Sequence, residues 1–281
     1  MRFASCKVLG WLAAAAVFAA AMVAVGAEPP AAPKVSSFAP AKDVAAQINF
    51  YVSRMEESDS LQNEAAFKQA LEDAKDTATG KVPDLPPQIA KDSNTVILLA
   101  LAAGLDDEDN QFKAAAPALL KAAQDLAKAK GYAAAKAGVA AVKKALDATE
   151  GNPGELKWVK SASLPDLMKQ VPLVNSRLKR NLRGPKFKSK AKDNAGDAAT
   201  LAVIAQGSMA DDSEAKKNNE DVQKWFKFCT QMRDAAAALN KAVHEGNREG
   251  ADKAMSALNQ SCDDCHAVFH KGAEKESGKD N

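Results

Sequence analysis

The residues with the clearest chemistry are Cys262, Cys265 and His266, which stand near the end of the chain in the order Cys-Asp-Asp-Cys-His. On a helix, positions three apart lie on the same side, so both sulfurs can reach one edge of a flat group while the imidazole turns towards its centre. C-x-x-C-H is the signature for covalent haem attachment, with two thioether bonds and a histidine bound to iron. The spacing therefore predicts one covalently bound haem c.

Other uses of a cysteine pair fit this sequence less well. A zinc site needs four well-placed ligands, which one short helix cannot supply alone, and a thioredoxin-like site needs a βαβ setting. The chain has two more cysteines, of which Cys6 falls in the first 27 residues and Cys229 stands alone. Cys229 lies on the apolar side of its expected helix, where a buried small apolar residue is the simplest interpretation.

The elements that must position the motif are helices. Aromatic residues are few, at 5%, β-branched runs are nearly absent, and apolar residues recur at spacings of three and four, so we predict an all-α protein. Towards the end of the chain, we expect a helix starting at Ser163, a second over about 193–210, a third with apolar positions from Val222 to Val243, and a last one that starts after a turn at 245–247 and contains the motif. Four amphipathic helices joined by short turns can all bury their apolar sides in a four-helix bundle.

The two halves of the chain carry similar features in the same order. Residues 52–55 (Val-Ser-Arg-Met) parallel 175–178 (Asn-Ser-Arg-Leu), and Asp106-Asp107 parallels Asp211-Asp212. We therefore predict a duplication, with two tandem antiparallel four-helix-bundle-like units. The helices of the first unit are expected over 41–56, 61–78, 92–105 and 108–148, the last span folding back near Gly131. The predicted domains are 41–160, without haem, and 161–281, with haem.

The start of the chain is typical of an exported protein. Basic Arg2 and Lys7 precede an uncharged, apolar stretch over 8–27, which predicts a signal peptide over 1–27 and a periplasmic or otherwise exported mature chain. The apolar stretch is also long enough to span a bilayer, so the alternative is an uncleaved membrane anchor. Residues 28–40 contain four prolines and are predicted to form an extended tether without a core of its own.

Charge limits the classes of partner. The chain has 38 basic and 36 acidic residues, and two of the basic ones fall in the predicted signal, so the remainder is neutral and argues against binding to nucleic acid. From Arg177 to Lys192 there are eight basic residues and no acidic one. This segment is interpreted either as a guide for an acidic redox partner protein towards the haem edge or as a solvated loop.

The position of the motif suggests a family. A C-terminal C-x-x-C-H, followed by Phe269 three residues after the histidine, on the last helix of a four-helix bundle resembles the class II c-type cytochromes, the cytochrome c′ family. The resemblance covers about 163–275 and is carried mostly by 262–269. This chain departs from the family at His270, where Arg or Lys is common. The first unit lacks the motif, since Glu150 to Gly154 occupies its place, so one haem is expected.

The resemblance also points to Met168. Low-spin members of the family have a methionine near the start of the first helix as second axial ligand, and five-coordinate members have an apolar residue there. Met168 stands at this place, and core packing is the alternative role. Pro172 follows four residues later and is expected to clash with the carbonyl of Met168 and bend the helix. Trp225 and Phe228 are interpreted either as haem neighbours or as core residues.

Taken together, these features predict an exported electron-transfer cytochrome that acts with a redox partner protein. Two alternatives are a five-coordinate haem protein that binds NO or CO and a structural helical protein with a haem domain. No second group of acid, base or nucleophile accompanies the motif, so we do not expect an enzyme. The oligomeric state is left open between a monomer and a homodimer. His244 is expected to be solvated and His270 to lie on the surface.

Overall fold

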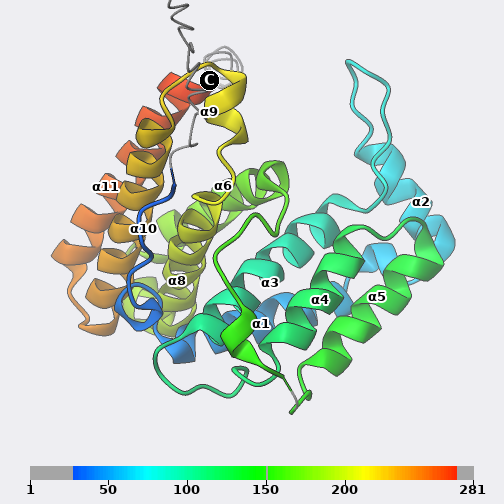
Figure 1. The fold of residues 1–281 in the computed structure, drawn as a ribbon, viewed down its shortest axis with the longest axis horizontal. Coiled ribbons are helices and arrows are strands. Elements are labelled where there is room, and N and C mark those ends of the chain that lie inside the picture. The colour runs from blue at the N-terminus through cyan, green and yellow to red at the C-terminus, as the bar shows by residue number, and fades with distance from the viewer. Residues whose placement is uncertain (1–27, 150, 271–281) are drawn as a thin grey trace, which may run out of the picture.

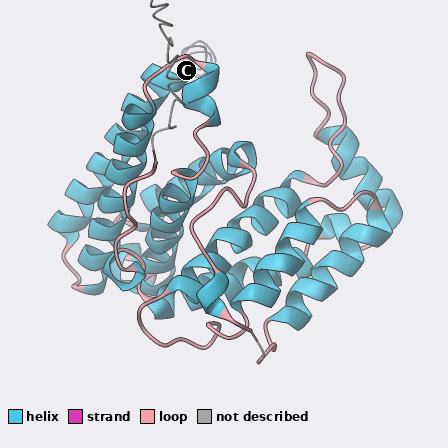
Figure 2. Cartoon of the chain, viewed as in Figure 1, coloured by secondary structure: helices cyan, strands magenta, loops and turns pink. Residues whose placement is uncertain are grey.

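The structure, a computed structural model, describes residues 28–149 and 151–270, and the predicted signal segment 1–27 lies outside them. Every regular element of the described part is a helix, so the predicted all-α class is confirmed (Figure 2). None of these helices combines the length and the apolar character that a membrane crossing requires. The helices are α1 (Ala41–Glu56), α2 (Glu64–Asp73), α3 (Pro87–Leu105), α4 (Ala116–Ala127), α5 (Tyr132–Ala145), α6 (Leu164–Asn181), α7 (Lys186–Ser189), α8 (Ala191–Ser208), α9 (Ser213–Lys217), α10 (Val222–His244) and α11 (Arg248–Phe269), with 3-10 turns at Val35–Ser37, Asp59–Leu61 and Pro153–Glu155.

The first half is built on α1, α3, α4 and α5, with α2 added beside α5 (Figure 1). Helix α3 packs on α1 and α4, α4 packs on α5, and α5 returns to α1, so the four helices close on one another. The helix expected over 108–148 is two helices separated at Gly131, whose φ of 80° suits a glycine. The helix expected from 92 starts earlier, at Pro87, because proline is well suited to the first helical turn.

The second half is built on α6, α8, α10 and α11. Helix α8 packs on α6 and α10, and α11 packs on α10, whereas α6 and α11 are not among the closely packed pairs. The sequence signals for the helix ends are confirmed: Ser163 accepts a hydrogen bond from the amide of Asp166, and Asn247 accepts one from the amide of Gly250. Gly246, with a φ of 65°, makes the turn between α10 and α11.

The two halves share one continuous apolar core, with α3 and α8 at its centre. Helix α1 packs on α8, and α3 packs on both α6 and α8. Polar contacts cross the same interface: Thr200 donates to Gln47, and Asn240 donates to the buried carboxylate of Asp43. His244 was expected to be solvated, but its side chain is only 33% exposed and its Nε2 lies 2.7 Å from the buried Asp43.

Each half contains a buried ion pair in an equivalent position. Arg54 of α1 pairs with Asp92 of α3, and Arg177 of α6 pairs with Asp197 of α8, in both cases through Nε and one terminal nitrogen. The Nε to carboxylate distances are 2.8 and 2.9 Å. Both aspartates are nearly inaccessible to solvent. Arg54 and Arg177 also occupy equivalent positions in the sequence, where residues 52–55 parallel 175–178.

The same repetition extends along α3 and α8. Thr95 and Thr200, each three residues after the buried aspartate, donate to the carbonyl four residues earlier. At the end of each helix, Asp106 and Asp211 accept a hydrogen bond from the amide two residues later. These contacts occupy corresponding places in the two helices.

The prediction of an extended tether without a core over residues 28–40 is partly wrong. Val35, Phe38 and Ala39 are buried in the shared core. Ser36 donates through its amide and hydroxyl to Asp107, and the guanidinium of Arg233 on α10 lies 5.9 Å from the ring of Phe38. The blue segment before α1 in Figure 1 is therefore part of the fold from Val35 onwards. Its prolines indicated an extended chain, but three apolar side chains in a short stretch suffice to anchor it.

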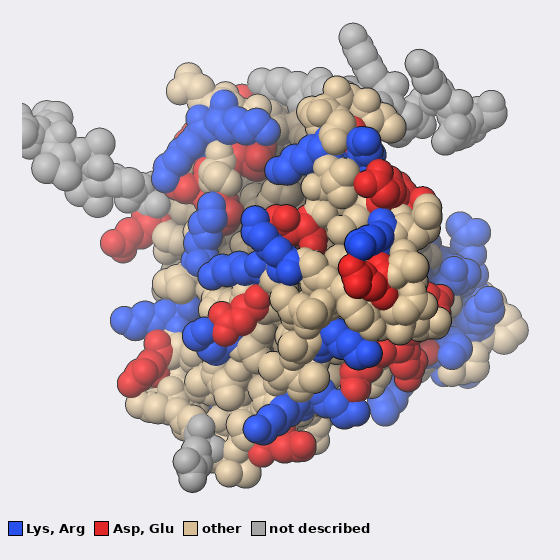
Figure 3. Space-filling view, turned by 90° about the vertical axis from the view of Figure 1, so that its right-hand side faces the viewer, with Lys and Arg blue, Asp and Glu red and all other residues tan. Residues whose placement is uncertain are grey.

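Charged side chains of both signs are interspersed on the face that carries α2 and α5 (Figure 3). Lys68 pairs with Glu64 one turn earlier on α2, and Lys143 of α5 pairs with Glu56 at the end of α1. These pairs are largely exposed, so each contributes little to stability.

Candidate haem-binding site

The predicted site residues meet at one apolar cavity of about 180 Å³. Cys262, Cys265 and His266 come from the second half of α11, and Met168 comes from the first half of α6. Both cysteines and Met168 are partly buried, while His266 lies at the exposed rim. The structure thus brings together all four residues. The other lining residues are Val171, Pro172, Asn175, Ala205, Ser208, Trp225, Phe228, Cys229, Met232 and Ser261.

The cavity exists because α6 and α11 do not pack closely on each other. In the first half, the corresponding helices α1 and α5 are in contact. A ligand pocket usually measures about 300–1,000 Å³. A flat group as large as haem would therefore be enclosed only in part, with its remainder in the opening. The walls are mostly apolar and offer three thiols, two thioethers and an imidazole. Among these, Cys262, Cys265 and His266 form a donor set that suits haem c.

Pro172 stands inside α6, which continues from Leu164 to Asn181. Proline has no amide hydrogen, so the carbonyl of Met168 loses its partner within the helix. The helix nevertheless continues past Pro172 without a break, and the expected bend at this turn stays a prediction.

Aromatic side chains close one end of the cavity. Trp225 donates from Nε1 to the carbonyl of Ser208 at 3.0 Å, and its ring meets that of Phe269 edge to face with centroids 5.4 Å apart. Phe228 makes a similar contact with Phe269 at 6.1 Å. These residues belong to a second apolar cluster at this end of α10 and α11. Trp225 and Phe228 therefore both line the cavity and pack in a core.

Burial controls the protonation of the site. It raises the pKa of Cys262, and together with the neighbouring Cys262 it raises the pKa of Cys265 to about 12. Both groups are thus thiols at neutral pH. Burial and the nearby His270 lower the pKa of His266, which favours the neutral imidazole that can bind a metal.

A protein-only metal site is not formed here. Within residues 28–149 and 151–270, no three His, Cys, Asp or Glu side chains gather in a group that could hold a metal ion. Zinc prefers four such ligands, with cysteine as thiolate. Haem differs because its porphyrin supplies four nitrogen ligands, so that the chain needs to supply axial ligands only.

The polar and sulfur-bearing wall residues that the sequence analysis did not identify include Asn175 and Met232. Asn175 lies one turn beyond Val171 on α6 and donates from Nδ2 to Asn259 at 3.0 Å, while its buried Oδ1 has no partner. Met232 contributes a second thioether, from α10. Asn175 follows Met168 by seven residues, and this helical spacing was the available signal. No pattern distinguished Met232 from an ordinary core residue.

Most of the basic segment lies away from the motif. Its short helix α7 is anchored by the buried Phe187, and Arg248 at the start of α11 stacks on that ring at 4.9 Å and donates to the carbonyl of Leu182. Cys262 lies 14 residues further along α11, which corresponds to about 21 Å. The loop after α6 therefore lies away from the motif, whereas Lys179, which belongs to the same basic segment but stands on α6, is near enough to Cys262 to lower its pKa. A role of the segment in guiding a redox partner stays a prediction.

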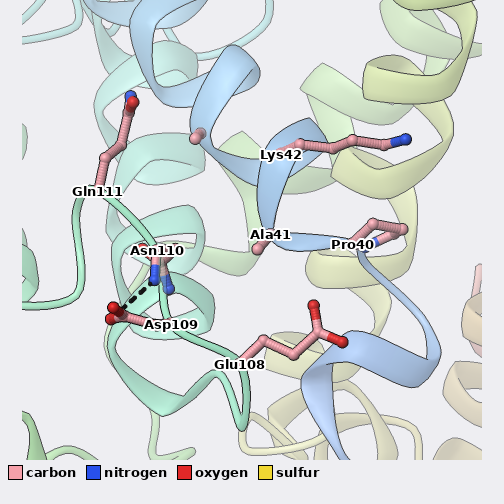
Figure 4. Close-up of a pocket in the computed structure, with 8 residues that line it drawn as sticks. Pro40, Ala41, Lys42, Glu108, Asp109, Asn110 and Gln111 are labelled. Carbon is pink, nitrogen blue, oxygen red and sulfur yellow. Dashed lines mark hydrogen bonds between the residues drawn. The ribbon is translucent and has the colours of Figure 1, made fainter.

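A larger hollow, of about 530 Å³, lies between the start of α1 and the loop before α4 (Figure 4). Surface residues such as Lys42, Glu108 and Gln111 line it, and the amide of Asn110 donates to Asp109. It is shallow and polar, and it contains no cysteine or histidine. The chemistry of the chain is therefore concentrated at the smaller, apolar cavity.

Comparisons of this chain with protein families, with curated proteins and with solved structures find no match.

Proposed function

We propose that this chain is an exported c-type cytochrome of the class II type, which carries one haem c and transfers electrons to or from a redox partner protein. The observation that supports this most is the meeting of Cys262, Cys265, His266 and Met168 at one apolar cavity. Residues from two helices distant in sequence converge there, which a chance occurrence of the motif would not require. We assign no catalytic residue and propose no enzymatic activity.

When bound, haem supplies an iron that can exchange one electron. In this chain Cys262 and Cys265 would anchor its edge covalently, and His266 would bind the iron from the α11 side. The apolar walls from α6, α8 and α10 would exclude water from the part of the group that they enclose and thereby help to set its reduction potential. The exposed rim near His266 leaves an edge through which a partner can exchange electrons.

The architecture supports a duplicated origin with two tandem four-helix units. The repeated Arg-Asp pairs, Thr hydrogen bonds and Asp turns are the supporting contacts. Only the second unit has both the motif and the gap between its first and last helices. We propose that the first unit, whose corresponding helices are in contact, supports the haem unit through the shared core. Export follows from the predicted signal peptide.

The proposal is tested by producing the full chain in a host that attaches haem to exported proteins. We expect a red protein that keeps its pigment through acid-acetone extraction and whose mass exceeds that of the polypeptide by one haem. The variant with Cys262→Ala and Cys265→Ala should lose covalent pigment. Cys229→Ala is the matched control, because it removes a thiol from the same cavity outside the motif, and it should keep the haem. A colourless native protein would refute the proposal.

A second candidate, a five-coordinate haem protein that binds NO or CO, is favoured by the apolar lining of the cavity. Met168→Ala separates the two. If the Met168 sulfur binds iron, this variant loses the methionine-to-iron absorption band and gains rapid CO binding in the reduced state. Met232→Ala, which removes a thioether from α10 instead, should leave the spectrum unchanged. Identical spectra for native protein and Met168→Ala would exclude Met168 as a ligand and favour the gas-binding candidate.

A further inference from the structure

A third thiol lines the same cavity as the motif. Cys229 lies on α10 and is 6% exposed, in an apolar cluster with Trp225 and Phe269. Cys265 of α11 packs against the same cluster. The proposed function uses Cys262 and Cys265 and leaves Cys229 without a role.

Helix geometry places Cys229 opposite Cys265. Helices α10 and α11 are antiparallel neighbours joined at Gly246, and the rings of Trp225 and Phe269 meet across their interface. One turn from Trp225 towards Gly246 is Cys229, and one turn from Phe269 towards Gly246 is Cys265. Residues four apart share a helix face. The two sulfurs therefore face the same stretch of the interface, one turn below the aromatic pair.

We propose that, in the chain before haem is attached, Cys229 and Cys265 form a disulfide that withholds Cys265 from haem until it is reduced. The inference rests on the proposed function, because it assigns a regulatory role to one of the two haem-anchoring thiols. It gives Cys229 a function in maturation and makes haem attachment depend on a supply of reductant.

Ordinary thiol–disulfide exchange would form the Cys229–Cys265 bond. An oxidising disulfide, such as oxidised glutathione or a disulfide-carrying oxidoreductase, accepts two electrons and two protons from the two thiols and leaves as two thiols. The Cys229–Cys265 bond is formed in return. A dithiol reductant reverses the step and restores Cys265. The free Cys265 thiol would then be available to anchor haem, and this step would need no further oxidant.

Cys262 is the competing partner, because it lies three residues before Cys265 on the same helix. A Cys262–Cys265 disulfide would join two neighbouring turns of α11, whereas a Cys229–Cys265 disulfide joins α10 to α11. The two products differ in the peptides that they link, so they can be told apart directly.

The test uses the full mature chain made without haem attachment and oxidised with oxidised glutathione. Free thiols are alkylated, and the chain is digested without reductant for mass spectrometry. We expect a Cys229–Cys265 linked pair and an alkylated Cys262. In the Cys262→Ala variant, the thiols of Cys229 and Cys265 should still be lost together on oxidation. A Cys262–Cys265 link in the native chain, or three alkylated cysteines, would overturn the inference.

Haem attachment supplies a second readout. When reductant is limiting, Cys229→Ala should accumulate several-fold more haem protein than the native chain, and the difference should vanish in excess reductant. Equal yields under both conditions would contradict a regulatory role. Failure of every reduced variant to attach haem would refute the proposed function instead and would leave the disulfide mapping unaffected. Circular dichroism of Cys229→Ala checks that the variant is folded.

Discussion

Replacement of Asp197 by alanine is expected to lower the free energy of unfolding by about 3–5 kcal/mol, measured by urea denaturation. The Asp197 side chain is 4% exposed and accepts two hydrogen bonds from Arg177. Burial raises the pKa of Asp197, and the hydrogen bonds and charge of Arg177 oppose that rise. Without the carboxylate, the largely buried guanidinium of Arg177 would lack its partner, and this accounts for the loss.

Three further variants test the cause. Asp92→Ala should be about as destabilising, because Asp92 holds Arg54 in the equivalent place of the first half. Lys68→Ala, which removes a partner from an exposed pair, should stay close to the native stability. Joint replacement of Arg177 and Asp197 by Met and Leu should restore much of the loss, since a buried ion pair can be exchanged for apolar residues. A change below about 1 kcal/mol for Asp197→Ala would contradict the argument.

The second large effect is expected at the closed end of the cavity. Trp225→Ala should reduce the free energy of unfolding by about 3–5 kcal/mol, because it leaves a void in a packed apolar cluster. Trp225 is 4% exposed, and its ring contacts Phe269. The substitution should also widen the cavity, and binding of a hydrophobic fluorescent dye to the chain without haem would detect this.

Trp225→Phe separates packing from hydrogen bonding. It keeps an aromatic ring near Phe269 but removes the donor to the carbonyl of Ser208, so we expect a smaller loss, of about 1–3 kcal/mol. Chemical denaturation of both variants gives the comparison. Equal losses for alanine and phenylalanine would show that ring packing contributes little at this position.

The sequence by itself determined the features that depend on short stretches of chain. Ser163 begins α6, Gly246 separates α10 from α11, and the apolar spacing predicts helices throughout, because capping, turn conformation and amphipathic periodicity are local properties. The motif Cys262 to His266 was predicted on the last helix for the same reason. The equivalence of Arg54 and Arg177 could also be read from the chain.

Tertiary structure decided which surfaces meet. Three features depend on how whole helices pack. They are the gap between α6 and α11, the place of the Met232 thioether in the cavity wall, and the packing of Cys229 against the side of α11 that carries Cys265. The burial of Phe38 and the distance between the basic loop and the motif depend on helix packing as well. These contacts join residues far apart in sequence, and a local pattern gives the face on which a side chain lies but not the partner that covers it.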